Sequence, residues 1–215
     1  MRAALFDLDR TLVRKETATL YVRWQREVGQ ATTRDLARVM FWVAQYTLGI
    51  LDAPAVAGRA VATLRGKPEQ EMIDECESWF RSHVLPHVAD EGRRAVERHK
   101  TAGDLVAIVT GATSYVARPL VRMLGIDHVV ASELEVVDGR FIGRFVELLC
   151  YGEGKVVRVE RLAREHAFAL DDAVFYTDSL TDLLFFLCVG DRVVVNPDPR
   201  LRRIARRRAW RIEAW

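Results

Sequence analysis

The chain has 215 residues, half of them apolar, which is enough for one well-packed core and a smaller second lobe. Its 32 basic and 30 acidic residues nearly cancel, so charge gives no general reason to bind nucleic acid or membranes. Three widely spaced cysteines without a C-x-x-C pair argue against a disulfide framework and a zinc site. With no leader segment and no stretch of roughly 20 uncharged residues, we expect a cytoplasmic protein without a membrane span.

The chain opens on a short apolar strand that breaks into acidic residues. Residues 3–6 predict a buried strand, and Asp7 and Asp9 follow it with one residue between them. Because successive strand side chains point to opposite faces, carboxylates at i and i+2 leave the strand end on the same side. Hard cations such as Mg²⁺ prefer oxygen ligands of this kind. This pair is the first candidate site.

A long helical stretch follows the first strand. The next comparable strand signal lies at residues 104–110, and apolar residues recur at intervals of three and four within 21–28, 36–43 and 72–80. This spacing predicts three or four helices. We expect residues 14–91 to form a helical cap domain and residues 1–13 and 92–215 to form an α/β core domain.

The rest of the chain alternates as in an open α/β sheet. Helices are expected at about 114–124 and 155–165, strands at 129–130, 173–176 and 192–195, a hairpin of 133–137 and 141–145 around Asp138-Gly139, and a basic helix at 199–208. The prediction is a Rossmann-like parallel sheet interrupted after its first strand by the helical insert.

Polar groups follow three of the predicted parallel strands. Asp7 and Asp9 follow the first, Thr110 and Gly111 the second, and Asp-Ser-Leu-Thr-Asp at 178–182 the third. In open parallel sheets ligands bind at the carboxyl ends of the strands, so these groups should converge on one crevice. Carboxylates, a hydroxyl and a metal ion there would form a phosphate site.

A lysine is the last candidate residue of this crevice. Lys155 begins a predicted helix after Gly152-Glu153-Gly154, where the freedom of glycine and a helix start could bring an ammonium to the same crevice.

In order and spacing, the candidate residues resemble the four motifs of the haloacid dehalogenase superfamily of phosphohydrolases: Asp7-Leu8-Asp9-Arg10-Thr11, Thr110, Lys155 and Asp178 to Asp182. The insert after the first motif is similar to the cap of subgroup IB, which includes phosphoserine phosphatase, and residues 153–155 and 196–199 are similar to that subgroup's later segments.

The resemblance implies a chemistry centred on the first motif. Asp7 would be the nucleophile that forms an aspartyl-phosphate, and Asp9 would be the acid and base. The resemblance also implies Mg²⁺, held by the Asp7 carboxylate, the Asp9 backbone carbonyl and the Asp178 carboxylate.

The other motif residues would handle the transferring phosphoryl group. Thr110 and Lys155 would neutralise its oxygens, and Asp182 would orient Lys155 or bind the metal through water. Thr11 and Gly111 are assigned to substrate binding with them. The expected partner is a small phosphomonoester, and the expected assembly is a monomer or homodimer.

Substrate choice should lie in the cap, because the motifs handle only the phosphoryl group. Glu16 stands where phosphoserine phosphatases carry an acidic residue for the substrate ammonium, and Arg59 is a candidate for a substrate carboxylate. Two departures count against phosphoserine itself: Thr110-Gly-Ala replaces the usual Ser-Gly-Gly, and Thr181 replaces the usual Asn. Histidinol phosphate, a phospholipid-derived phosphate, and phosphotransfer to an alcohol remain open.

Two aromatic or basic groups have alternative interpretations. The insert's rings are expected mainly to pack as core, although they could line a pocket for a larger leaving group: Tyr21, Trp24, Phe41, Trp42 and Tyr46. The end of the chain is expected to be a solvated helix, although it could dock on anionic lipid or nucleic acid: Arg200, Arg202, Arg203, Arg206, Arg207, Arg208 and Arg211, with Trp210 and Trp215.

Overall fold

The first strand lies inside a sheet and is apolar for that reason. The computed structural model describes residues 1–47, 52–147 and 149–215, and the side chain of Tyr46 is outside the described part. Strand β1 (Ala3–Phe6) has strands on both edges and all four of its residues are buried. Only a continuous apolar run fits a strand that is covered on both faces.

The sheet has six strands and every neighbouring pair is parallel. The other strands are β2 (Leu105–Thr113), β3 (His128–Ser132), β6 (Ala173–Thr177), β7 (Asp191–Val195) and β8 (Arg211–Glu213). Their order is β3-β2-β1-β6-β7-β8, so the winding direction reverses between β1 and β6. The predicted Rossmann-like sheet is confirmed, whereas β8 was not predicted.

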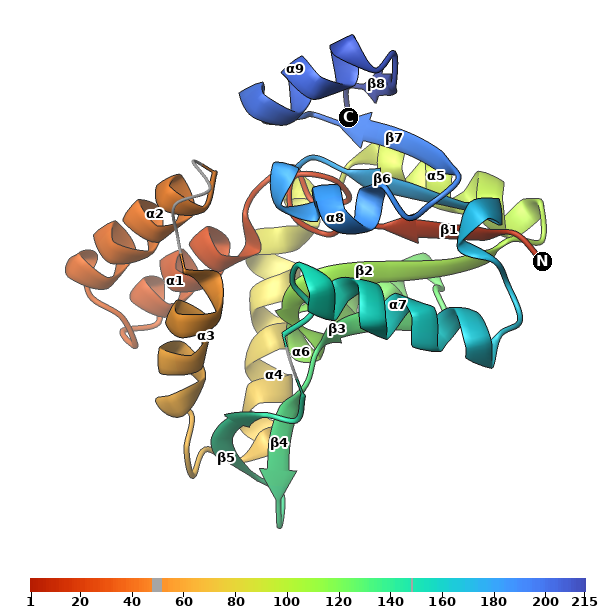
Figure 1. Cartoon of the computed structure of the whole chain (residues 1–215). Helices are drawn as coiled ribbons and strands as arrows, with labels where there is room; N and C mark the ends of the chain where they lie inside the picture. The colour runs from red at the N-terminus through yellow and green to blue at the C-terminus, as the bar shows by residue number, and fades with distance from the viewer. Residues whose placement is uncertain (48–51, 148) are drawn as a thin grey trace.

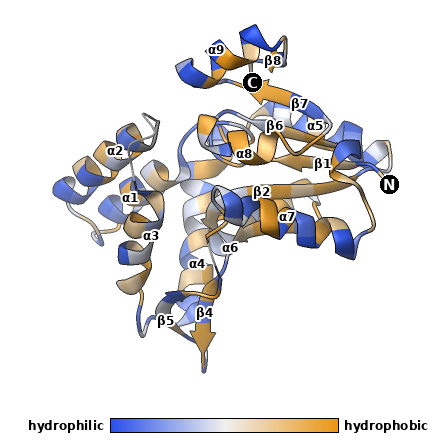
Figure 2. Cartoon of the chain, in the orientation of Figure 1, coloured by the Kyte–Doolittle hydropathy of each residue, from blue (hydrophilic) through white to orange (hydrophobic). Residues whose placement is uncertain are grey.

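Helices cover both faces of this sheet (Figure 1). On one face lie α5 (Asp90–Thr101) and α6 (Ser114–Leu124), and on the other α7 (Glu153–Glu165), α8 (Leu183–Phe186) and α9 (Pro199–Arg207). Alternate residues of β1 pack into the two hydrophobic cores, one on each face of the sheet. Ala4 and Phe6 belong to the core under α5 and α6, and Ala3 and Leu5 to the core on the opposite face. Figure 2 shows the central strands as apolar and the helices as mixed.

The insert contains the predicted helices. They are α1 (Thr17–Glu27), α2 (Thr33–Thr47), α3 (Ala53–Ala62) and α4 (Glu69–Trp79), followed by a π-helical turn, η1 (Phe80–Val84), and a 3-10 turn, η2 (Leu85–His87). Figure 1 shows α1 to α3 on the side of the sheet toward which β1 points. Two predicted core positions of α2 are exposed instead: Met40, which belongs to the predicted apolar stripe, and Phe41, one of the rings expected to pack as core.

The predicted hairpin forms and packs against the insert. Its strands are β4 (Leu134–Val137) and β5 (Arg140–Phe145), joined by Asp138 and Gly139, which both have positive φ as a two-residue hairpin turn requires. Leu134 and Phe141 pack with Val61 of α3 and with other apolar residues of the insert. A segment assigned to the core domain thus contacts the predicted cap, and the domain boundaries themselves stay a prediction.

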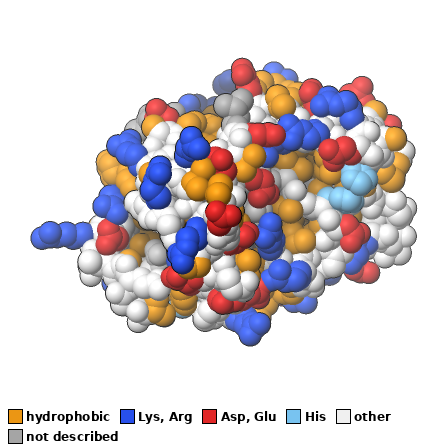
Figure 3. All heavy atoms as spheres, turned by 90° about the horizontal axis from the view of Figure 1, so that it is seen from below, with side chains coloured by type: hydrophobic (Ala, Val, Ile, Leu, Met, Phe, Trp, Pro, Cys, Tyr) orange, Lys and Arg blue, Asp and Glu red, His pale blue; other side chains and the backbone are white. Residues whose placement is uncertain are grey.

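Short elements and the surface complete the fold. Two 3-10 turns, η3 (Leu170–Asp172) and η4 (Leu180–Asp182), flank β6. On α9, Leu201 and Ala205 are buried while its arginines lie at the surface. Acidic and basic side chains are interspersed over the face seen in Figure 3. None of the described helices combines the length and apolar composition needed to span a bilayer.

Candidate active site

The site begins where β1 ends. The Asp7 N–H donates to the carbonyl oxygen of Tyr176 at 2.9 Å, which extends the β1–β6 pairing one residue beyond the strand. This bond fixes the backbone that carries the Asp7 carboxylate at the point where the winding of the sheet reverses. Open α/β sheets bind ligands at such a point.

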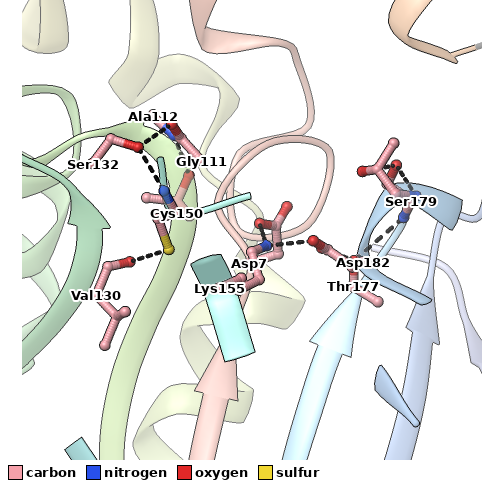
Figure 4. Close-up of polar contacts among 12 residues, drawn as sticks. Asp7, Gly111, Ala112, Val130, Ser132, Cys150, Lys155, Thr177, Ser179 and Asp182 are labelled. Carbon is pink, nitrogen blue, oxygen red and sulfur yellow. Dashed lines mark hydrogen bonds and ion pairs between the residues drawn. The ribbon is translucent and has the colours of Figure 1, made fainter. Parts of the chain in front are cut away.

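A buried lysine joins the ends of two strands. Lys155, in the first turn of α7, places its Nζ 3.3 Å from Asp7 Oδ1 and 2.5 Å from Asp182 Oδ1 (Figure 4). Thr177 Oγ1 donates to the second oxygen of Asp182 at 2.7 Å. Gly152 precedes α7 with φ +54°, a conformation that glycine adopts without strain. The predicted convergence of Asp7, Lys155 and Asp182 is therefore present.

Burial controls the charges of this group. Desolvation raises the pKa of Asp7 well above its ordinary value, and the Lys155 charge is the largest opposing effect. Burial alone would lower the pKa of Lys155, but Asp182 and Asp7 outweigh it and raise that pKa overall. Lys155 is consequently a permanent cation that favours the ionised form of Asp7.

Asp9 lies against the start of the first insert helix. The backbone N–H of Thr17 donates to Asp9 Oδ1 at 2.6 Å, using one of the N-terminal amides of α1 that have no partner within the helix. Burial raises the pKa of Asp9, and the hydrogen bonds from Thr17 oppose this rise. A carboxyl group with a raised pKa can hold a proton nearer to neutral pH, as an acid catalyst must.

Asp178 has a partner that the sequence did not predict. Arg10 Nε lies 3.1 Å from Asp178 Oδ2, and the side chain of Asp178 is 8% exposed. Desolvation raises the pKa of Asp178 well above its usual value, with further increases from the charges of Asp7 and Glu16, whereas Arg10 lowers it. In the sequence Arg10 is only a member of the first motif, because the direction of a long side chain depends on tertiary contacts.

The second motif lies inside β2, which continues to Thr113, three residues beyond its predicted end. Thr110 is buried, and its Oγ1 accepts a hydrogen bond from the Ala112 N–H at 3.1 Å. Gly111 is exposed, and its carbonyl oxygen accepts from Ser132 Oγ at 2.9 Å. Ser132 Oγ also accepts from the Cys150 N–H at 3.1 Å, so it connects Gly111 of β2 with the segment that leads to α7 (Figure 4). Sequence reasoning missed Ser132.

Three residues assigned to substrate binding lie in different settings. Thr11 is fully buried, and its Oγ1 has no hydrogen-bond partner among the described residues. Glu16 directly precedes α1; burial raises its pKa to about 8, with a further increase from Asp9 and a decrease from Arg10. Arg59 is exposed on α3, where its Nε donates to the Ala55 carbonyl oxygen at 3.3 Å. In the described part of the chain no contact joins Arg59 to the site.

The donor set suits a hard divalent cation. Asp7 and Asp178 are buried carboxylates, and the charge of Asp7 raises the pKa of Asp178. A cation between them would relieve this repulsion, and oxygen ligands are those that Mg²⁺ prefers. Among the described residues, no three His, Cys, Asp or Glu side chains form a metal cluster, so two carboxylates and the Asp9 backbone carbonyl would have to suffice.

Comparison with known proteins assigns the family. A family model described as haloacid dehalogenase-like hydrolase matches residues 4–186, which include the residues of all four motifs. The chain belongs to this hydrolase family. The match runs from β1 through the insert to α8 and so covers both parts of the molecule.

Two of the named relatives are phosphatases. Phosphoserine phosphatase SerB1 of Mycobacterium tuberculosis is 31% identical over 214 residues, covering 98% of this chain and 70% of that protein. Histidinol-phosphatase of Neisseria meningitidis serogroup C is 26% identical over 213 residues, 96% of each chain. A crystal structure of a protein with unknown function from Bordetella pertussis Tohama I has a TM-score of 0.88 at 32% identity, and the match covers 99% of this chain and 97% of that one.

The predicted superfamily, the likeness to phosphoserine phosphatases and the phosphatase class of enzyme are thereby confirmed.

Proposed function

We propose that this haloacid dehalogenase-like phosphatase hydrolyses a small, amine-bearing phosphomonoester through an aspartyl-phosphate on Asp7, with Mg²⁺ as cofactor. The observation that carries the proposal is the buried Lys155, which lies between Asp7 and Asp182 at the carboxyl ends of β1 and β6. A buried cation beside a buried carboxylate keeps the latter available as a nucleophile and also attracts the anionic substrate.

The first half-reaction transfers the phosphoryl group to the enzyme. An Asp7 carboxylate oxygen forms a bond to phosphorus while the bond between phosphorus and the leaving oxygen breaks. Asp9, whose pKa is raised by burial, donates its proton to that oxygen, so the product leaves as an alcohol. The Thr17 N–H then stabilises the Asp9 carboxylate that remains.

The second half-reaction returns the enzyme to its starting state. The Asp9 carboxylate accepts a proton from a water molecule, whose oxygen bonds to phosphorus while the bond from phosphorus to Asp7 breaks. Inorganic phosphate leaves, and Asp9 again holds its proton. An alcohol that replaced water in this step would give a new phosphate ester, which is the phosphotransfer alternative.

The metal and the phosphoryl oxygens would be held by the remaining residues. Asp7, Asp178 and the Asp9 carbonyl would bind Mg²⁺, which supplies positive charge that lets an anionic nucleophile approach an anionic phosphate. Thr110 retains its hydroxyl proton for donation, because its oxygen accepts the Ala112 N–H. With Lys155 it would neutralise the transferring oxygens.

The amine preference rests on Glu16. Burial and the charge of Asp9 raise its pKa to about 8 and Arg10 offsets only part of this rise, so a substrate ammonium would supply further compensating charge. Phosphoserine and histidinol phosphate, the compounds named in the relatives' activities, both carry an amine. The exposed position of Arg59 gives no support for a second, carboxylate-binding contact.

The decisive experiment measures phosphate release. The panel comprises phosphoserine, histidinol phosphate, phosphoethanolamine and glycerol phosphate, each with Mg²⁺ or with EDTA. We expect Mg²⁺-dependent turnover, strongest on an amine-bearing substrate, that Asp7→Asn lowers at least about 1,000-fold and the exposed Asp171→Asn leaves unchanged. Turnover that survives Asp7→Asn would exclude the nucleophile, and silence across the panel would exclude the substrate class. The cytoplasmic location and the assembly stay predictions.

A further inference from the structure

Arg10 adopts an unusual backbone conformation beside the catalytic residues. Its φ is +54°, a region that residues other than glycine rarely occupy. The side-chain amide of Asn196 donates to the Arg10 carbonyl oxygen at 3.3 Å and helps to hold this conformation. The chain therefore tolerates local strain at a residue between Asp9 and Thr11, and the result is a guanidinium directed at Asp178.

Arg10 also belongs to a basic pocket beside the site. A pocket of about 370 Å³ is lined by Arg10, Arg14, Lys15, Glu16, Asn196 and Trp215. Arg14 is paired outside the active site, since its guanidinium lies 2.9 Å from Glu91. Arg10 instead contacts Asp178, so it connects the pocket with the carboxylates of the site.

The contact between Arg10 and Asp178 conflicts with the proposed metal. Asp178 would donate a carboxylate oxygen to Mg²⁺, and the guanidinium already lies 3.1 Å from Oδ2 of that carboxylate. Two cations at one carboxylate repel each other, the more strongly because Asp178 is buried. The Arg10 side chain is 35% exposed and can move, whereas Asp178 is held by a backbone bond from Asp198 to its carbonyl oxygen at 3.0 Å.

We propose that Arg10 exchanges one anionic partner for another during the catalytic cycle. Without metal its guanidinium neutralises Asp178; when a divalent cation binds Asp178, the guanidinium moves away and binds an anionic oxygen of the phosphate-bearing ligand. Arg10 thus lowers metal affinity and raises phosphate affinity. The inference rests on the proposed function for the identity of the metal and the ligand class.

The test measures binding without turnover. Titration calorimetry gives the Mg²⁺ dissociation constant in phosphate-free buffer and the inorganic phosphate dissociation constant at saturating Mg²⁺. In Arg10→Met we expect Mg²⁺ to bind about three- to tenfold more tightly and phosphate about tenfold more weakly, the range for loss of a partly buried charge contact. Arg10→Lys keeps the charge and should stay near the wild type in both measurements.

Opposite signs separate this role from a structural one. If Arg10 only held Asp178 in place, Arg10→Met would weaken Mg²⁺ binding, and that result would overturn the proposal. A change in only one of the two dissociation constants would also overturn it. Arg14→Met is the matched control, because it removes the same charge from the same pocket without touching Asp178; an equal effect there would also overturn it. Wild-type protein that binds Mg²⁺ but hydrolyses no phosphomonoester would refute the proposed function and leave this test intact.

Discussion

The buried lysine provides the sharpest test of how the site is held together. Replacing Lys155 with methionine keeps most of its volume and removes its charge. Its contacts with Asp182 at 2.5 Å and Asp7 at 3.3 Å involve side chains that are 4%, 5% and 10% exposed, so solvent screening is weak. Loss of one partner from a buried ion pair costs about 3–5 kcal/mol in the free energy of unfolding, and we expect about 3 kcal/mol for Lys155→Met at pH 8.

The loss should depend on pH in a defined direction. Lys155 is the main effect that lowers the pKa of Asp7, so its removal raises the folded-state pKa of Asp7 further above the unfolded value. A carboxyl group with a raised folded-state pKa destabilises the folded protein above that pKa and no longer does so once both states are protonated. The stability deficit of Lys155→Met should therefore shrink by about 1 kcal/mol or more between pH 8 and pH 5.

Urea denaturation at both pH values measures these changes. The double variant Lys155→Met/Asp182→Asn should recover about 2 kcal/mol relative to Lys155→Met, because the amide oxygen can still accept the Thr177 hydroxyl while the unpaired charge is gone. Lys15→Met, at an exposed lysine, should stay within about 0.5 kcal/mol of the wild type. A loss that is equal at both pH values and additive in the double variant would refute the electrostatic reasoning.

Three further substitutions test separate parts of the site. Thr17→Pro removes the N–H that donates to Asp9, and the first position of a helix accepts proline. The pKa of Asp9 should therefore rise, and the basic limb of the pH profile of kcat/KM should move up by about one pH unit. Glu16→Gln should raise KM for amine-bearing substrates and leave KM for glycerol phosphate unchanged. In the wild type, KM for an amine-bearing substrate should fall as pH approaches 8, because Glu16 becomes ionised. Asp178→Asn should preserve or raise the metal-free Tm, because it removes a buried charge, and should abolish the increase in Tm that Mg²⁺ gives the wild type.

Much of the site was predictable because strand ends are predictable. An apolar run that breaks into polar residues marks both a buried strand and its end, and parallel strands share one end of the sheet. That reasoning places Asp7, Thr110 and Asp178 at one edge of the sheet without knowledge of the strand order. Asp7 and Asp178 directly follow β1 and β6, whereas Thr110 lies inside β2, three residues before its end. Lys155 followed from the glycines before its helix, which begins two residues earlier than predicted, at Glu153.

The remaining features depend on tertiary contacts that local patterns do not encode. The partners of Arg10 and Thr17 lie on other elements, and only the folded chain shows that they reach Asp178 and Asp9. Strand β8 is short and follows arginines, so it has little apolar signal of its own and forms by pairing with β7. Likewise, the alternation in β4–β5 predicts a hairpin but not the surface against which it packs.

Burial has two consequences for the three aspartates of the site: it raises their pKa values, and it requires the fold to hold their carboxyl groups in place. Burial raises the pKa values of Asp7, Asp9 and Asp178, because it makes their ionised forms unfavourable without a compensating charge. The chain offsets this by attaching each group to rigid structure: Asp7 to β1, whose residues are fully buried, Asp9 to the first turn of α1, and Asp178 to the backbone after β7. Because α1 belongs to the insert, movement of that helix would remove the Thr17 hydrogen bond and change the acidity of Asp9. In the proposed reaction, proton transfer at Asp9 would therefore depend on the position of the insert through the 2.6 Å hydrogen bond from the Thr17 N–H.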